Sequence, residues 1–148
     1  MIAVGFVVTK RIRIVAFGKI KESYLLEGIQ EYAKRLSPFC NLELVELKDE
    51  GLEKEAVKLE KYLGPNTFVL DVEGKEMSSL EFAAFVKKHE GDFTLIVGGA
   101  DGIDPSVKKK TSLISLSAMT FTHEMSRLIL LEQVYRAYMI NGNKRYHR

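Results

Sequence analysis

The hydrophobic residues of this chain follow two spacings along the sequence, one typical of strands and one typical of helices. Short and mostly apolar runs predict strands at 11–17, 42–47, 67–72, 93–97 and 113–116. Between them, apolar residues at every third or fourth position predict helices at 23–36, 52–63, 78–87 and 124–140, with a short helix after Asp104. Such alternation predicts one α/β domain, with a mainly parallel sheet and helices on both faces.

Two of these helices start with recognisable capping signals. Ser78, with Glu81 three residues later, has the form of a capping box, in which each residue bonds to the main chain of the other. Asp104 followed by Pro105 combines a favourable N-cap residue with a proline in the first turn. These signals place helix starts directly after predicted strands or loops, as the alternating pattern requires.

The length of 148 residues fits a single domain, assigned here to 11–148. Residues 1–10 form a further apolar run, which could add an edge strand but which we interpret as an N-terminal extension outside the domain. No apolar run approaches the roughly 20 residues of a membrane helix, and the only cysteine, Cys40, excludes an internal disulfide. We therefore expect a cytoplasmic protein that has no contact with a membrane.

Charge is distributed unevenly along the chain. Residues 1–104 contain 14 Lys and Arg against 18 Asp and Glu, whereas residues 105–148 contain 8 against 2. A basic segment suits a polyanion such as RNA, although a solvated helix face would look the same. At its end, Lys144 and Arg145 precede Tyr146, His147 and Arg148, a set that could stack on a base and hold phosphates. A frayed basic end is the alternative.

Two loops that follow predicted strands are candidate ligand sites, because parallel sheets bind ligands at the C-terminal ends of their strands. Gly98–Gly102 contains three glycines, which allow close approach of the main chain to a ligand, or simply a tight turn. Residues 113–122 alternate hydroxyl and apolar side chains, which suits a ligand with an aromatic ring but also a half-buried strand. Neither loop has the pattern of a nucleotide triphosphatase.

A metal site is not predicted. His123 and Glu124 start like a zinc-binding helix, but Arg127 stands where the second histidine would be needed. We interpret His123 as a residue at a helix start. Glu132 and Arg136, four residues apart, predict an ion pair on the surface of the last helix.

Taken together and in order, several motifs resemble the ribosomal RNA large-subunit methyltransferase H family of SPOUT-class enzymes. They are FVLDVEGK at 68–75, LIVGGADG at 95–102, SLSAMTFTH at 115–123, EQVYRA at 132–137 and the final YHR. The resemblance covers residues 12–148. It implies a C-terminal trefoil knot, a homodimer, and methylation of N3 of a pseudouridine in large-subunit (23S) ribosomal RNA with S-adenosylmethionine.

The resemblance also implies roles for individual residues. The cofactor site would comprise Leu70, Gly98, Gly99, Leu116, Ser117, Ala118, Met119, Thr120 and Phe121. Catalysis would fall to Tyr146, His147 and Arg148 beside the substrate base, with His147 as a candidate general base, and RNA would be bound by His123, Arg127, Lys144 and Arg145. The chain departs from the family at Ala100, where proline is common. Two alternatives to this function remain. One is methylation of another rRNA or tRNA nucleotide, and the other is a catalytically silent RNA-binding module.

Overall fold

The computed structural model describes residues 10–147, so most of the expected extension at 1–10, and Arg148, lie outside the described residues. The strands are β1 (Arg11–Phe17), β2 (Asn41–Leu47), β3 (Thr67–Glu76), β4 (Phe93–Val97) and β5 (Ser112–Ser115). The helices are α1 (Ser23–Leu36), α2 (Leu52–Leu59), η1 (Glu60–Tyr62), α3 (Ser79–Lys88), α4 (Pro105–Lys108) and α5 (His123–Asn141). The predicted alternation of strands and helices is confirmed.

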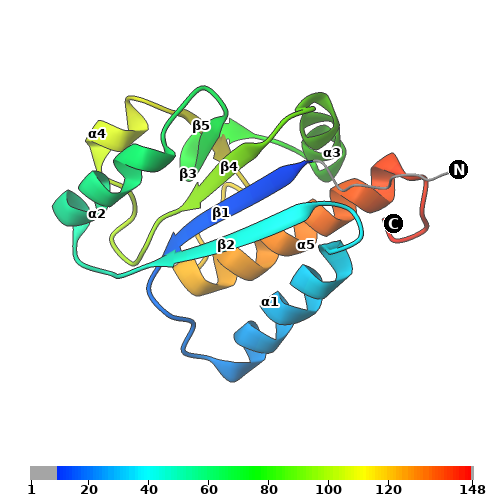
Figure 1. Ribbon diagram of the computed structural model, residues 1–148, viewed down its shortest axis with the longest axis horizontal. Helices are drawn as coiled ribbons and strands as arrows, with labels where there is room; N and C mark the ends of the chain where they lie inside the picture. Colours follow the sequence, from blue (N-terminus) through cyan, green and yellow to red (C-terminus); the bar gives the residue numbers. More distant parts are fainter. Residues whose placement is uncertain (1–9, 148) are drawn as a thin grey trace, which may run out of the picture.

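The five strands form one sheet in the order β2-β1-β4-β3-β5, and every neighbouring pair is parallel (Figure 1). Strands β1 and β4 lie inside the sheet, and all five residues of β4 are buried. Because all strands run the same way, the loops that follow them meet at one edge of the sheet. The predicted parallel sheet is therefore confirmed, and it brings the two candidate loops to the same edge.

Helices cover both faces of the sheet, as predicted. Helices α1, α3 and α5 pack together on one face, over a core that includes Ile14, Leu95 and Val134 (Figure 1). Helices α2 and α4 cover the other face, where a second core includes Val69 and Ile96. The helix α5 runs beneath the sheet from the edge with the ligand loops toward the opposite edge.

Strand β3 is longer than its predicted range of 67–72, since it continues to Glu76. Its pairing with β5 shifts register between Leu70 and Lys75, which allows the strand to bulge and then pair again. At Gly74 a Cβ atom would lie 2.6 Å from the main-chain nitrogen of Ile114. A glycine is required there because the two strands approach too closely for any side chain, a constraint that hydrophobic spacing does not show.

The predicted caps are present. Ser78 and Glu81 form the full capping box of α3, and the Asp104 carboxylate accepts from the Ser106 N–H at 2.8 Å. Helix α2 is shorter than the predicted 52–63, because its last turn tightens into the 3₁₀ helix η1 before Gly64. Within residues 10–147, no helix is both long and apolar enough to cross a membrane.

Candidate functional site

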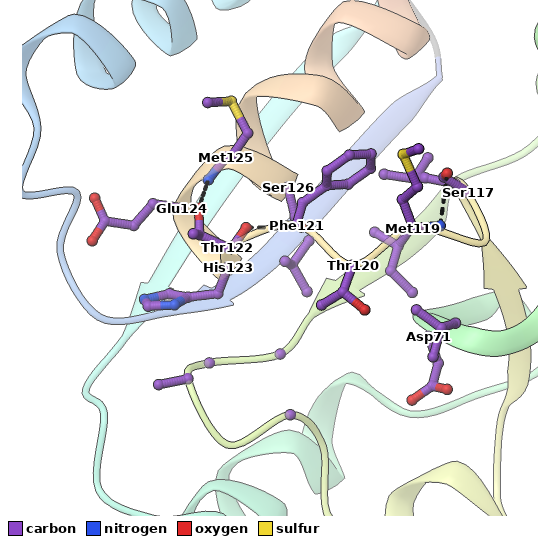
Figure 2. Close-up of a pocket in the computed structure, with 18 of the residues that line it drawn as sticks. Asp71, Ser117, Met119, Thr120, Phe121, Thr122, His123, Glu124, Met125 and Ser126 are labelled. Atoms are coloured by element: carbon purple, nitrogen blue, oxygen red, sulfur yellow. Dashed lines mark hydrogen bonds between the residues drawn. The ribbon is translucent and has the colours of Figure 1, made fainter.

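A cavity of about 750 Å³ lies at the edge of the sheet where the strands end. Its volume is within the range of small-molecule sites. The residues that follow β3, β4 and β5, the first residues of α1 and the first turn of α5 supply its walls. Figure 2 shows this cavity, with the segment from Ser117 to Thr122 running across it toward α5.

Nearly all residues of the expected cofactor site line this one cavity. They are Leu70, Gly98, Gly99, Leu116, Ser117, Met119, Thr120 and Phe121, and only Ala118 of the expected set is not a lining residue. His123, which we expected to bind RNA, also lines it. Residues from three separate stretches of the sequence therefore converge on a single concave site.

The glycine loop after β4 folds back on itself and turns its main chain toward the cavity. The Gly102 N–H donates to the Gly99 carbonyl at 3.0 Å, and Gly102 has a φ of +80°, a conformation that favours glycine. A Cβ at Gly98 would lie 2.8 Å from the Gly102 carbonyl group. This hydrogen bond closes the loop although position 100 is alanine. A side chain at Gly98 would displace the loop.

The segment after β5 is shaped by its hydroxyl groups. The Ser115 hydroxyl donates to the Ser117 carbonyl at 2.8 Å, and the Ser117 hydroxyl accepts from the Met119 N–H at 3.0 Å. At the far end, the Thr122 hydroxyl caps α5 by accepting from the Met125 N–H at 3.2 Å (Figure 2). Met119 is 73% exposed at the cavity, so an apolar and flexible side chain is available to a ligand.

Asp71 also lines the cavity, although sequence analysis did not select it. Its carboxylate lies 2.7 Å from Nζ of Lys108 in α4. Burial raises the pKa of Asp71, but the hydrogen bonds from Lys108 and from the Glu73 N–H outweigh it, so the net pKa is below its ordinary value. The pair neutralises most of the charge on this wall of the cavity.

Arg127 occupies a different place from the one expected of an RNA-binding residue. It is only 8% exposed, and its guanidinium donates to the Phe17 carbonyl at 2.7 Å, to the Gly18 carbonyl, and to Glu46 at 2.9 Å. These groups belong to the ends of β1 and β2 and to the residue after β1. In this chain Arg127 therefore joins the first turns of α5 to the sheet, and its guanidinium is turned away from solvent.

The tail folds onto the middle of α5. The Tyr146 hydroxyl donates to Glu132 at 2.7 Å and lies 2.9 Å from the Tyr32 hydroxyl, while Nδ1 of His147 lies 3.1 Å from the Arg136 guanidinium. Burial raises the pKa of Tyr146, and its hydrogen bonds with Tyr32 and Glu132 raise it further. Lys144 and Arg145 are exposed, as an RNA contact would require.

Glu132 and Arg136 form the predicted ion pair, with a distance of 2.7 Å. Sequence analysis interpreted this pair as a feature of the helix surface and missed that it holds Tyr146 and His147. The only signal was its position in the EQVYRA motif. The spacing of four residues explains the ion pair but gives no hint of the tail that packs on it.

Within one chain, the tail and the cavity are separate. None of the residues that line the cavity comes from the stretch 127–147. Glu132, which binds Tyr146, lies nine residues after His123 on the same helix, about 14 Å along its axis. The structure therefore does not bring the tail residues and the cofactor loops of a single chain together.

A buried acid, Glu55, lies behind the glycine loop and is paired with the exposed Asp49. Burial raises the pKa of Glu55 above its ordinary value of 4.5, and a hydrogen bond with Asp49 raises it further. N–H groups of Glu50 and Gly51, each at 3.0 Å, oppose this rise without cancelling it. A Cβ at Gly99 would lie 4.0 Å from the Glu55 carboxylate, so this acid is close to the glycine loop.

A raised pKa in the folded state predicts how stability changes with pH. The contribution of Glu55 to the free energy of unfolding is complete below pH 4.5, the ordinary pKa of a glutamate. It is lost as the pH rises through the raised pKa of Glu55 in the folded protein. Glu55→Gln imitates the protonated acid, so its free energy of unfolding should exceed that of the wild type by a margin that grows as the pH rises above 4.5. Urea unfolding at several pH values measures this difference, and parallel curves for the two proteins would contradict it.

Comparison with known proteins identifies the family. The family model described as "Predicted SPOUT methyltransferase" matches residues 10–147. Proteins named "Ribosomal RNA large subunit methyltransferase H" from Acetivibrio thermocellus, Bifidobacterium adolescentis and Streptococcus equi subsp. zooepidemicus are 44%, 40% and 38% identical to this chain. Each alignment covers 93% of this chain and 99% of the relative.

The solved structures give the same fold. A probable methylase family protein from Haemophilus influenzae superposes with a TM-score of 0.55 at 12% identity, over 94% of this chain and 70% of the other. The fold and the cavity at the strand ends, together with the family match, define this chain as a member of the SPOUT methyltransferase family. Within that family it belongs with the ribosomal RNA large subunit methyltransferase H proteins.

Residues 10–147 contain no group of three metal-ligating side chains.

Proposed function

We propose that this protein methylates N3 of a pseudouridine in large-subunit ribosomal RNA, in the cytoplasm, with S-adenosylmethionine as the methyl donor. Membership of the family supports methyl transfer to rRNA, and the relatives bear that activity in their name. The nucleotide and its N3 atom follow from the resemblance of the motifs. The single observation that carries the proposal is the convergence of both motif loops on one cavity.

The cavity suits the proposed methyl donor. Leu70, Leu116 and Met119 offer apolar surface for an adenine ring, and the bare main chain at Gly98 and Gly99 allows close approach to its polar edges. S-adenosylmethionine supplies a methyl group on a positively charged sulfur. The chain has to hold that group and the base in line, which is a problem of positioning rather than of covalent chemistry on the protein.

We assign the second half of the site to the tail. Lys144, Arg145 and Arg148 would bind phosphates and favour the N3 anion of the base by their positive charge. Tyr146 and His147 would contact the base, and His147 is the candidate acceptor of the N3 proton. The ion pair of Glu132 and Arg136 fixes the orientation of both rings.

The distance between tail and cavity supports a homodimer. Because the two parts of the site lie apart within one chain, we propose that the tail of one subunit reaches the cavity of its partner. The resemblance to the family also implies a C-terminal trefoil knot. Both features remain proposals for this chain.

Calorimetric titration with S-adenosylmethionine tests the proposed cofactor site. The wild type should bind saturably with one site per chain. Gly98→Ala should lose at least about tenfold in affinity, because its methyl group would meet the Gly102 carbonyl at 2.8 Å and displace the loop. Gly91→Ala is the matched control, since no atom lies within 4 Å of the added Cβ. Absence of binding by the folded wild type would contradict the proposal.

A further inference from the structure

Glu22 and the first turn of α1 form a wall of the cavity to which the proposed cofactor site gives no role. Glu22, Tyr24 and Leu25 line the cavity opposite the residues of the cofactor loops. Leu25 is buried in the core, but Tyr24 is 62% exposed. Tyr24 therefore exposes an aromatic ring to solvent beside the cavity that we propose as the cofactor site.

The loop at 18–22, just before this wall, has exposed positive charge, although its lysines do not line the cavity. Lys19 and Lys21 are exposed, and neither belongs to an ion pair among residues 10–147. Glu22 is the one carboxylate between residues 18 and 24. One carboxylate oxygen of Glu124 already accepts a hydrogen bond from the Lys21 main-chain N–H at 2.9 Å. Two free cations beside an exposed aromatic ring match an unpaired nucleotide in both charge and shape.

The segment at 18–22 is hydrogen-bonded to α5 and to the end of β2. Arg127 donates to the carbonyls of Phe17 and Gly18, the Gly18 N–H donates to the Leu47 carbonyl at 2.8 Å, and Glu124 accepts from Lys21. Arg127 and Glu124 lie in the first turns of α5, directly after the cofactor segment. One helix therefore fixes both walls of the cavity relative to each other, which lowers the entropy cost of binding a ligand between them.

We propose that Lys19, Lys21 and Tyr24 form an RNA-binding wall, in which Tyr24 stacks on an unpaired base of the substrate loop and the lysines bind flanking phosphates. This inference rests on the proposed function, and it adds a substrate contact that the family motifs do not include. The two parts of the protein then contact different parts of the RNA. The tail of the partner would approach the target base, and this wall would hold the neighbouring nucleotides.

The test compares variants of the full-length protein in methyl transfer to ribosomal particles that lack the methyl group. Tyr24→Ala should raise KM for the particles roughly tenfold, since base stacking on an aromatic ring is lost, and Tyr24→Phe should restore it. The double variant Lys19→Gln, Lys21→Gln should raise KM and reduce its dependence on salt. Its matched control is Lys61→Gln, Lys110→Gln, which removes two exposed lysines that lie outside the stretch from Gly18 to Leu25.

Two further measurements distinguish an RNA contact from a role of these side chains in cofactor binding or dimer formation. Calorimetry should give the wild-type affinity for S-adenosylmethionine in all variants, and sedimentation should give the wild-type oligomeric state. Unchanged KM values would overturn the proposal, as would a shift of Tyr24→Ala to monomer, which would make Tyr24 a subunit contact. If the wild type itself transferred no methyl group to the particles, the proposed function would fail instead.

Discussion

Deletion of residues 144–148 is expected to reduce methyl transfer to ribosomal RNA by about a hundredfold or more, because catalysis loses several groups that stabilise the developing charge. The affinity for S-adenosylmethionine should not change, since no residue from Arg127 to His147 lines the cavity of its own chain. The measurements are a methylation assay with ribosomal particles and calorimetry with the methyl donor. Loss of methyl-donor binding in the truncated protein would contradict the separation of the two half-sites.

A mixed dimer shows whether the tail acts on its own cavity or on that of the partner. One subunit lacks residues 144–148 and the other has Gly98→Ala, so that neither subunit is complete. If the tail acts across the interface, one of the two composite sites is intact and about half of the wild-type activity should remain. Homodimers of either variant are the controls, and at a methyl-donor concentration too low to saturate Gly98→Ala both should have far less activity than the mixed dimer. An inactive mixed dimer would show that the tail acts within its own chain.

The second large effect concerns stability. Arg127→Met should lower the free energy of unfolding by about 2–4 kcal/mol, because the buried Phe17 carbonyl and the part-buried Gly18 carbonyl lose their donor and Glu46 loses its partner. The remaining folded protein should bind S-adenosylmethionine more weakly, since α5 and the segment before it are no longer fixed to β1. Urea unfolding and calorimetry measure the two effects.

A matched control removes an arginine from the surface. Arg35 pairs with Glu31 four residues earlier on α1, and both side chains are largely exposed. Arg35→Met should therefore leave the urea midpoint close to that of the wild type. Equal midpoints for Arg127→Met and Arg35→Met would mean that the buried guanidinium does not hold α5 to the sheet.

The agreement between sequence and structure is greatest where a signal is local. Capping at Ser78 and Asp104, and the burial of β4, depend on a few neighbouring residues and on hydrophobic spacing. The elements and the parallel sheet therefore follow from the chain alone. The cofactor residues were assigned by motif resemblance, and the structure places eight of those nine residues along one cavity.

The roles of Arg127, Glu132 and Arg136 required the tertiary structure. In sequence Arg127 is one basic residue in a basic segment, and only packing of α5 under the sheet buries it against the ends of β1 and β2. Likewise, the ion pair at Glu132 acquires its meaning from a tail that folds back onto it. The sequence determined the elements and the type of site, because these depend on local spacing and motifs. Contacts between residues distant in the chain decided which charges are buried. They also decided that the tail and the cofactor cavity of one chain lie apart.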